Sequence, residues 1–311
     1  MDEKLLDIQD LSVWYKTYRG FAEVVDHINL YVGKGEKIGL VGESGCGKTT
    51  TMKMVMRTLD ERGIKVGEGS KLLFGGEDIL AMDAKALLDL RRRKISMISQ
   101  SPMAALNPVF TIGQQMMDVL KYSGQFDKHD KKGMLDAARK AIDSVMIPDP
   151  DRILNSYPHQ LSGGMRQRIC IATSLLTPRQ LLIADEPTNG LDQDSKQQTL
   201  SLLNGLFPDA AKLIITHDIS AAATCDRILV LCGGRMLETG ISSEVLTAPY
   251  HPYTKALLGA LVENGMRETP ALRTETGFCP FYRRCPSARD RCRTEMPPRK
   301  NNSREWWCCA E

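Results

Sequence analysis

A glycine-rich segment at residues 42–49 carries the strongest chemical signal in the chain. It reads GESGCGKT and matches the pattern G-x-x-x-x-G-K-[ST]. A polyphosphate needs many N–H donors pointing into one concavity, which bulky side chains would block. The lysine adds a positive charge for the terminal phosphates, and the next threonine adds a hydroxyl for Mg²⁺. The phosphate-binding residues expected here are Gly42, Ser44, Gly45, Gly47, Lys48, Thr49 and Thr50.

A pair of adjacent acids supplies a second chemical signal. Residues 181–184 form an apolar run that predicts a buried strand, and Asp185 and Glu186 follow it directly. A carboxylate at the carboxyl edge of a parallel sheet lies where such folds bind ligands. We expect Asp185 to hold Mg²⁺ through water and Glu186 to polarise an attacking water. Two acids with separate tasks favour hydrolysis over transfer to a bound acceptor.

Two more polar side chains follow predicted strands. Gln100 comes after an alternating strand at residues 95–99, and His217 comes after the apolar run in LIITHD. The Gln100 amide can reach both Mg²⁺ and the attacking water. A histidine after a strand is more often structural, but a third polar residue at the same rim favours contact with the γ-phosphate or the water. Both are candidate catalytic residues.

The segment LSGGMRQRICIATSLL at residues 161–176 predicts a second phosphate-binding element. A serine and two glycines precede an amphipathic helix, and a helix N-terminus favours anions. One nucleotide does not need two distant phosphate grips. We therefore expect this segment to bind the nucleotide of a facing subunit, through Ser162 and Gly164.

These motifs, in this order, resemble the ATP-binding subunits of ABC transporters over residues 1 to about 240. The resemblance implies two subunits stacked head to tail, with each ATP between Lys48 of one and Ser162 of the other. It also implies that Gly163 and Gln167 of the signature contact the same ATP, and that Asp192, in the turn GLD, lies at that interface. An aromatic residue before the first core strand should stack on adenine. Tyr15 has the expected spacing, and its competitors are Trp14, Tyr18 and Phe21.

Later segments resemble the dipeptide, oligopeptide and nickel importer branch of this family. They are SQSPMAALNPVFTIGQQ, YHPYTKALLGAL and a cysteine-bearing tail. The resemblance implies a different second ATP-binding subunit, two transmembrane permease subunits and, indirectly, an external substrate-binding protein. Residues 101–114 are candidates for contact with the permease. Short peptides are the expected cargo, with nickel or oligosaccharides as alternatives.

Rivals from other classes fit less well. A soluble ABC ATPase that acts on ribosomes or DNA usually has two ATP-binding units or a long coiled-coil insertion. This chain has one phosphate loop and no heptad run. The serine–glycine signature argues against a P-loop kinase or GTPase. The net charge of +3 is too small to indicate nucleic-acid binding.

The tail gathers five of the nine cysteines, in CPFYRRCPSARDRC and a final CC. A reducing cytosol makes structural disulfides rare. Zinc sites favour ligand pairs separated by two to four residues, whereas thiolate ligation at wider spacing suits a [4Fe–4S] cluster. The importer branch has a similar tail motif that binds such a cluster, while zinc and reduced thiols stay open. The expected ligands are Cys279, Cys285, Cys292 and Cys308, with Cys309 as an alternative to the last.

The elements that position these residues predict an α/β protein. The expected fold is the P-loop ABC ATPase fold with a parallel core, an antiparallel β portion and a helical subdomain at about residues 101–178. We expect an ATP-binding domain at residues 1–240 and a cysteine-bearing extension at 241–311. The chain has 311 residues, 42% of them hydrophobic, and no window of about 18 apolar residues. We expect a peripheral protein at the cytoplasmic face of the inner membrane.

Overall fold

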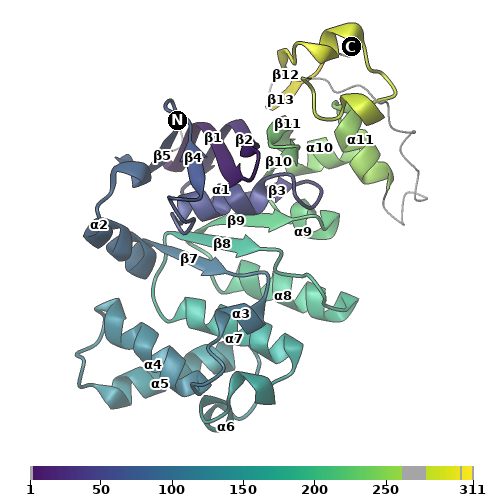
Figure 1. The fold of residues 1–311 in the computed structure, drawn as a ribbon. Helices are drawn as coiled ribbons and strands as arrows, with labels where there is room; N and C mark the ends of the chain where they lie inside the picture. Colours follow the sequence, from purple (N-terminus) through teal and green to yellow (C-terminus); the bar gives the residue numbers. More distant parts are fainter. Residues whose placement is uncertain (1–2, 261–277, 302, 310–311) are drawn as a thin grey trace. The chain divides into compact units, whose positions relative to one another are not determined.

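A computed structural model describes residues 3–260, 278–301 and 303–309. The chain forms two compact units (Figure 1). The first unit contains Met1–Ala81 and Leu213–Glu311, and the second contains Met82–Lys212. The chain enters the second unit after Ala81 and leaves it inside strand β9. The candidate site residues are therefore divided between two units, each of which has its own core.

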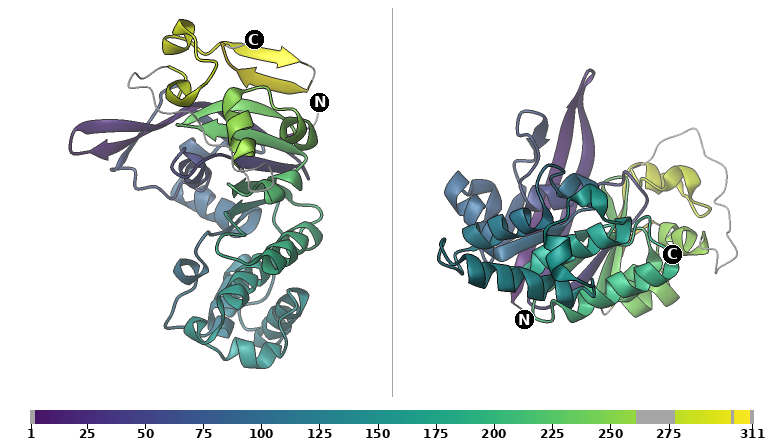
Figure 2. Two further views of the ribbon diagram at one scale, coloured as in Figure 1. Left: turned by 90° about the vertical axis from the view of Figure 1, so that its right-hand side faces the viewer. Right: turned by 90° about the horizontal axis from the view of Figure 1, so that it is seen from below.

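An antiparallel sheet forms the N-terminal part of the first unit. Its order is β2-β1-β5-β6, and β4 also pairs with β1. Figure 2 shows the hairpin of the two long strands projecting from this part of the unit. Along β2, residues 27–32 alternate between exposed and buried, as expected for a sheet with one covered face. The strands are β1 (Lys4–Thr17), β2 (Gly20–Gly33), β4 (Ile64–Val66), β5 (Lys71–Phe74) and β6 (Glu77–Asp78).

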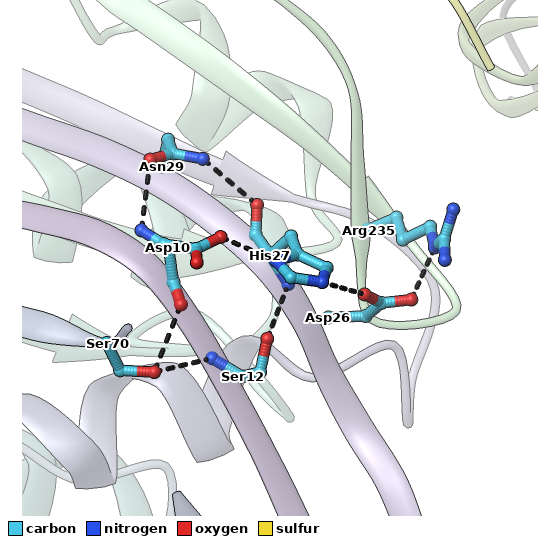
Figure 3. Close-up of polar contacts among 7 residues, drawn as sticks. All are labelled: Asp10, Ser12, Asp26, His27, Asn29, Ser70 and Arg235. Atoms are coloured by element: carbon cyan, nitrogen blue, oxygen red, sulfur yellow. Dashed lines mark hydrogen bonds and ion pairs between the residues drawn. The ribbon is translucent and has the colours of Figure 1, made fainter. Parts of the chain in front are cut away.

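Pairing within this hairpin is irregular, and β1 has two partners besides β2. Asp10 and His27 have φ angles of 50° and 53°, and the β1–β2 register shifts on either side of Leu11. Side chains satisfy the displaced backbone groups: His27 N–H donates to Ser12, and Asp10 accepts from the His27 ring (Figure 3). The first half of β1 consequently pairs with β5, and its last part pairs with β4.

The central sheet of the first unit holds the element that precedes the phosphate loop. Strand β3 pairs in parallel with β10, and the sheet order in this unit is β12-β13-β11-β10-β3-β9. Nearly every residue of β3, β9 and β10 is buried, as expected for strands covered on both faces. The strands are β3 (Lys37–Val41), β9 (Ala211–Thr216), β10 (Arg227–Cys232) and β11 (Arg235–Ile241). The helices of this unit are α1 (Lys48–Val55), α9 (Ile219–Ala223), α10 (Ser242–Thr247) and α11 (Pro252–Gly259).

The C-terminal extension packs onto this sheet. Strand β12 (Pro298–Asn301) pairs with β13 (Arg304–Trp307), and β13 pairs with β11. Glu238 on β11 is fully buried and accepts hydrogen bonds from Arg304 and from the N–H groups of Tyr250 and His251. Two short 3₁₀ helices, Tyr282–Arg284 and Asp290–Arg293, complete the extension. The extension thus shares a core with the first unit, which includes Tyr253, Phe281, Tyr282 and four of the tail cysteines.

The second unit is mostly helical. Parallel strands β7 (Ile95–Ile98) and β8 (Leu181–Asp185) are accompanied by helices whose apolar faces form one core. Figure 1 shows α4 and α5 side by side within this unit. Its main helices are α2 (Ala84–Asp89), α3 (Pro102–Ala105), α4 (Ile112–Ser123), α5 (Lys131–Ser144), α6 (Pro150–Leu154), α7 (Gly163–Leu175) and α8 (Gln193–Gly205).

The ATPase fold predicted from the motifs is confirmed by this mixture of parallel core, antiparallel portion and helices, and by the structural comparisons given below. Within the described residues, none of the helices combines the length and apolar character needed to cross a bilayer.

Candidate functional site

The phosphate loop connects β3 to α1 in the first unit. Gly45 and Gly47 have φ angles of 81° and 103°, a region that suits glycine. A Cβ atom added to Gly42 would lie 2.2 Å from the backbone oxygen of Leu231 on β10. The turn between β10 and β11 also supports the loop, because Gly234 N–H donates to the Cys46 carbonyl at 3.0 Å. Glycine is therefore required here by the packing of the loop as well as by access to phosphate.

Lys48 begins helix α1 and reaches back over the loop. Its Nζ donates to the carbonyls of Gly42 at 2.6 Å and Glu43 at 3.0 Å, and the residue is 5% exposed. The ammonium group is therefore held against the same loop whose N–H groups would bind phosphate. A glycine cradle, a helix N-terminus and a lysine in one place fit a triphosphate.

The predicted adenine-stacking residue lies beside this loop. The Tyr15 hydroxyl is 3.4 Å from the Thr50 hydroxyl in the first turn of α1. Its competitors are placed differently: Lys65 covers the Trp14 ring, and Tyr18 and Phe21 are exposed. The position of Tyr15 therefore favours it among the four aromatic residues.

His217 is exposed and directly follows β9, which neighbours β3 in the sheet. The phosphate loop follows β3, so His217 and the loop come directly after neighbouring strands of the same sheet.

The second unit brings the two acids and the glutamine to one sheet edge. The β7–β8 register places Ile98 opposite Ala184, so Gln100 and Glu186 leave the sheet at the same level. Asp185 and Glu186 are 3% and 8% exposed. Glu186 has a φ angle of 48°, which is uncommon for a residue with a side chain. Carboxylate and amide oxygens are ligands that suit Mg²⁺, so Asp185 and Gln100 of the second unit fit this ion.

The signature segment begins helix α7 as expected. The Ser162 side chain caps the helix by accepting a hydrogen bond from Met165 N–H at 3.2 Å. Ser162 and Gly163 are exposed, and no atom within 4 Å would obstruct a Cβ on Gly163 or Gly164. This helix N-terminus is therefore open to a ligand.

Two other residues assigned to the interface make contacts inside the second unit. Gln167 is 5% exposed, and its amide donates to the Pro187 carbonyl at 3.1 Å. It thereby links α7 to the turn that follows Glu186. Asp192 is exposed and caps α8 by accepting from Ser195 N–H at 3.0 Å, which lowers the pKa of its carboxyl. Sequence reasoning had not identified either contact.

Four of the five cysteines of the extension, Cys279, Cys285, Cys292 and Cys309, belong to the core of the first unit. Cys279, Cys285, Cys292, Cys308 and Cys309 are all buried. Burial raises the pKa of the Cys279 thiol to about 12, and Cys285, Cys292 and Cys308 add to this shift through their charges. The other three predicted ligands therefore lie within electrostatic reach of Cys279. Among the described residues, however, no group of three or more His, Cys, Asp or Glu side chains has the arrangement of a metal site.

Sequence profiles match two parts of the chain. The profile described as ABC transporter matches residues 25–189, and that described as Oligopeptide/dipeptide transporter, C-terminal region, matches residues 237–292.

Curated relatives match nearly the whole chain. The chain is 40% identical to the dipeptide transport ATP-binding protein DppD of Bacillus subtilis, over 92% of this chain and 88% of the relative. It is 37% identical to the oligopeptide transport ATP-binding protein OppD of Escherichia coli, over 95% and 89% of the two chains.

Solved structures share the fold. The dimeric ATP-binding cassette MJ0796, in a post-hydrolysis state with ADP and Pi, matches with a TM-score of 0.68 at 24% identity, over 76% of this chain and 98% of that one. CbiO1 of Clostridium perfringens, part of the transporter complex CbiONQ, matches with a TM-score of 0.65 at 23% identity, over 84% and 95%.

Proposed function

The chain belongs to the ABC transporter ATP-binding family, and on that premise we propose that it hydrolyses ATP to energise an importer of short peptides. The observation that carries this function is the match to dipeptide and oligopeptide transport ATP-binding proteins along more than nine tenths of the chain. The glycine cradle with Lys48 supports ATP as the substrate. Membrane permease subunits are the partners that follow.

The residues divide the reaction between binding and proton transfer. Loop N–H groups and Lys48 bind the phosphates, and Tyr15 orients the base. Magnesium, held through Thr49, Asp185 and Gln100, would neutralise charge that develops on the phosphates. Glu186 accepts a proton from the attacking water, while His217 and Gln100 orient that water. This assignment is supported by the common sheet edge of Gln100, Asp185 and Glu186 in the second unit.

Assembly completes the site in this proposal. Ser162, Gly163 and Gly164 bind the phosphates of a facing ATP-binding subunit, with Asp192 at the same interface, and the open N-terminus of α7 supports this role. The facing subunit is a different ATP-binding protein, and both lie beneath two permease subunits. An external binding protein delivers the cargo to these permeases. The protein would then be peripheral, at the cytoplasmic face of the membrane.

Reconstitution tests the transport function. The chain is co-expressed with candidate permease genes and a companion ATPase gene, then purified through a tag on this chain. We expect the permeases to co-purify and short peptides to stimulate ATP hydrolysis when the binding protein is added. If peptides do not stimulate hydrolysis but nickel or an oligosaccharide does, that compound and not a short peptide is the cargo. A tagged chain that purifies with ribosomes and without permeases would contradict transport.

We also propose that Cys279, Cys285, Cys292 and Cys308 hold a [4Fe–4S] cluster that secures the extension. Support comes from a buried set of thiols around Cys279 and from a surplus of positive charge after residue 278, where eight Lys and Arg stand against four Asp and Glu. This surplus would help to offset an anionic cluster. Metal binding must displace the thiol protons, so it is coupled to pH.

Absorbance of anaerobically purified protein tests the cluster. A broad brown band with about four iron atoms per chain is expected, and it should be lost in Cys285→Ser. Cys170→Ser, in the core of the second unit, is the matched control. A colourless protein with stoichiometric zinc, or one with reduced thiols alone, would contradict the proposal.

A further inference from the structure

Glu43 places a negative charge inside the loop that must receive a triphosphate. It is the second residue of GESGCGKT, and its side chain is 47% exposed. A carboxylate near an incoming polyanion repels it and weakens binding unless another group compensates the charge. Lys48 contacts the Glu43 carbonyl, which leaves the carboxylate to other partners.

The C-terminal extension supplies the compensating group. Arg284 donates from Nη1 and Nη2 to the two carboxylate oxygens of Glu43, each at 2.8 Å. This is the bidentate geometry that makes Arg–carboxylate pairs both strong and directional. The Arg284 side chain is 27% exposed, so the pair is partly shielded from water. The two residues are 241 positions apart in the sequence.

The same region holds the loop through the backbone as well. Glu43 N–H donates to the Tyr253 hydroxyl at 3.1 Å, and Tyr253 packs edge-on against Phe281 with 5.3 Å between ring centroids. Tyr253 and Phe281 are each 1% exposed. Arg284 thus fixes the side chain of Glu43, and Tyr253 fixes its backbone.

A second contact joins the extension to the support of the loop. Arg235 lies 3.6 Å from the Phe278 ring and also pairs with Asp26 (Figure 3). Its neighbour Gly234 donates to the Cys46 carbonyl, and Pro280 packs against Gly233. Phe278 and Pro280 of the extension therefore contact the hairpin at residues 232–235, which donates a hydrogen bond to the loop.

We propose that Arg284 is a positioning residue for nucleotide binding: it neutralises Glu43 and turns this carboxylate aside, so that the C-terminal extension completes the phosphate loop. The inference rests on the proposed binding of ATP. It assigns to the extension a direct role in nucleotide affinity, in addition to any role of its cysteines. The competing explanation is that the ion pair only fastens the extension to the first unit.

A double-mutant cycle separates these two explanations. Affinities for MgATP and MgADP are measured on the full chain for wild type, Arg284→Gln, Glu43→Gln and the double variant. We expect Arg284→Gln to weaken MgATP binding roughly three- to tenfold, since a half-exposed charge interaction is screened. MgADP, with less charge, should be affected less. Glu43→Gln should bind at least as well as wild type.

Rescue is the decisive result. The double variant lacks the ion pair too, but it has no uncompensated carboxylate, so its MgATP affinity should return to within about twofold of wild type. Arg283→Gln, which removes the same charge from the exposed neighbouring residue, is the matched control. In steady-state assays the Arg284 effect should be in KM, with kcat preserved.

Other outcomes overturn the inference. If the double variant binds MgATP as weakly as Arg284→Gln, the pair serves only to fasten the extension. If Arg284→Gln binds normally, the charge does not matter. Should Arg284→Gln fail to fold, Arg284→Lys keeps the charge without the fork, and unchanged affinity there would contradict a need for bidentate positioning. A wild-type chain that binds no ATP would contradict the proposed function instead.

Discussion

At the scale of the residue, Glu186 combines burial with an unusual backbone. A non-glycine residue at a φ angle of 48° costs free energy that the surrounding structure must offset. The turn after it is fixed by Asn189 N–H, which donates to the Glu186 carbonyl at 3.1 Å, and by Gln167, which contacts Pro187. Such strain clusters at functional sites, which supports the assignment of Glu186 as the base.

Glu186→Gln tests this assignment. The amide keeps the shape of the side chain but cannot accept the proton, so hydrolysis should fall by roughly 10² to 10⁴, while MgATP binding is retained. Phosphate release and nucleotide affinity are measured separately. Asp143→Asn, an exposed acid on α5, is the control for the same chemical change. Undiminished turnover in Glu186→Gln would remove it as the base.

The burial of His251 predicts that the folded protein loses stability in acid. Burial lowers its pKa to about 3, and the residue is 1% exposed. Between pH 6.5 and this value the unfolded chain binds a proton that the native chain does not, so stability is lost as pH falls. The contribution of one such group is about 1.4 kcal/mol per pH unit.

His251→Asn should flatten the dependence of unfolding free energy on pH between 6.5 and 4.5. Asparagine preserves an acceptor for Tyr253 N–H, which His251 caps at the start of α11. Chemical denaturation at several pH values measures the slope, with exposed His159→Asn as the matched control. If His251→Asn keeps the wild-type slope, another group carries the acid sensitivity.

Local signatures explain which residues could be located from the sequence. Lys48, Asp185, Glu186 and Ser162 each lie within a short motif that a strand or helix accompanies, and these elements are present where predicted. The pairing of Arg284 with Glu43 has no such signal, because its partners are brought together only by the tertiary fold.

At the scale of the element, close packing decides whether the loop after β3 can form. A methyl group on Gly42 would meet the Leu231 backbone oxygen at 2.2 Å and the Cys46 sulfur at 2.8 Å. A backbone oxygen cannot move away from the added methyl group as the end of a flexible side chain can. The loop or strand β10 must therefore move if this glycine is replaced.

Gly42→Ala should destabilise the protein by about 1–3 kcal/mol and weaken MgATP binding by more than tenfold. Denaturation and nucleotide titration measure the two effects. Gly205→Ala, at the end of α8 with no atom within 4 Å of the added Cβ, is the control and should be neutral or slightly stabilising. Equal behaviour of the two variants would show that the close approach of β10 is not required.

Some elements could not be predicted from pattern. The buried strands β3, β8 and β9 are apolar runs, which are readable in the sequence. Strand β12, by contrast, has the sequence PRKN, which has no alternation. It forms because β13 offers an edge after pairing with β11.

At the scale of the whole molecule, the proposed active site requires two ATP-binding subunits. With Glu186→Gln and MgATP, we expect this chain and its companion ATPase to form a stable dimer, measurable by light scattering after size exclusion. Ser162→Asp preserves an acceptor that caps α7 but places a negative charge against the facing triphosphate. It should abolish the dimer without loss of MgATP binding to its own loop.

A strictly monomeric Glu186→Gln preparation, alone and with the companion, would contradict the shared site. Dimers that persist in Ser162→Asp would show that the signature serine is not at the interface.

The contact between Arg284 and Glu43 has a consequence for biosynthesis. Chains emerge from the ribosome N-terminus first at roughly 5–20 residues per second, so the 241 positions between the two residues correspond to a delay of about 10–50 s. During that interval a nascent chain presents GESGCGKT without its arginine. If Arg284 sets nucleotide affinity, the growing polypeptide reaches its full affinity for ATP only after residue 284 has emerged, when translation is nearly finished.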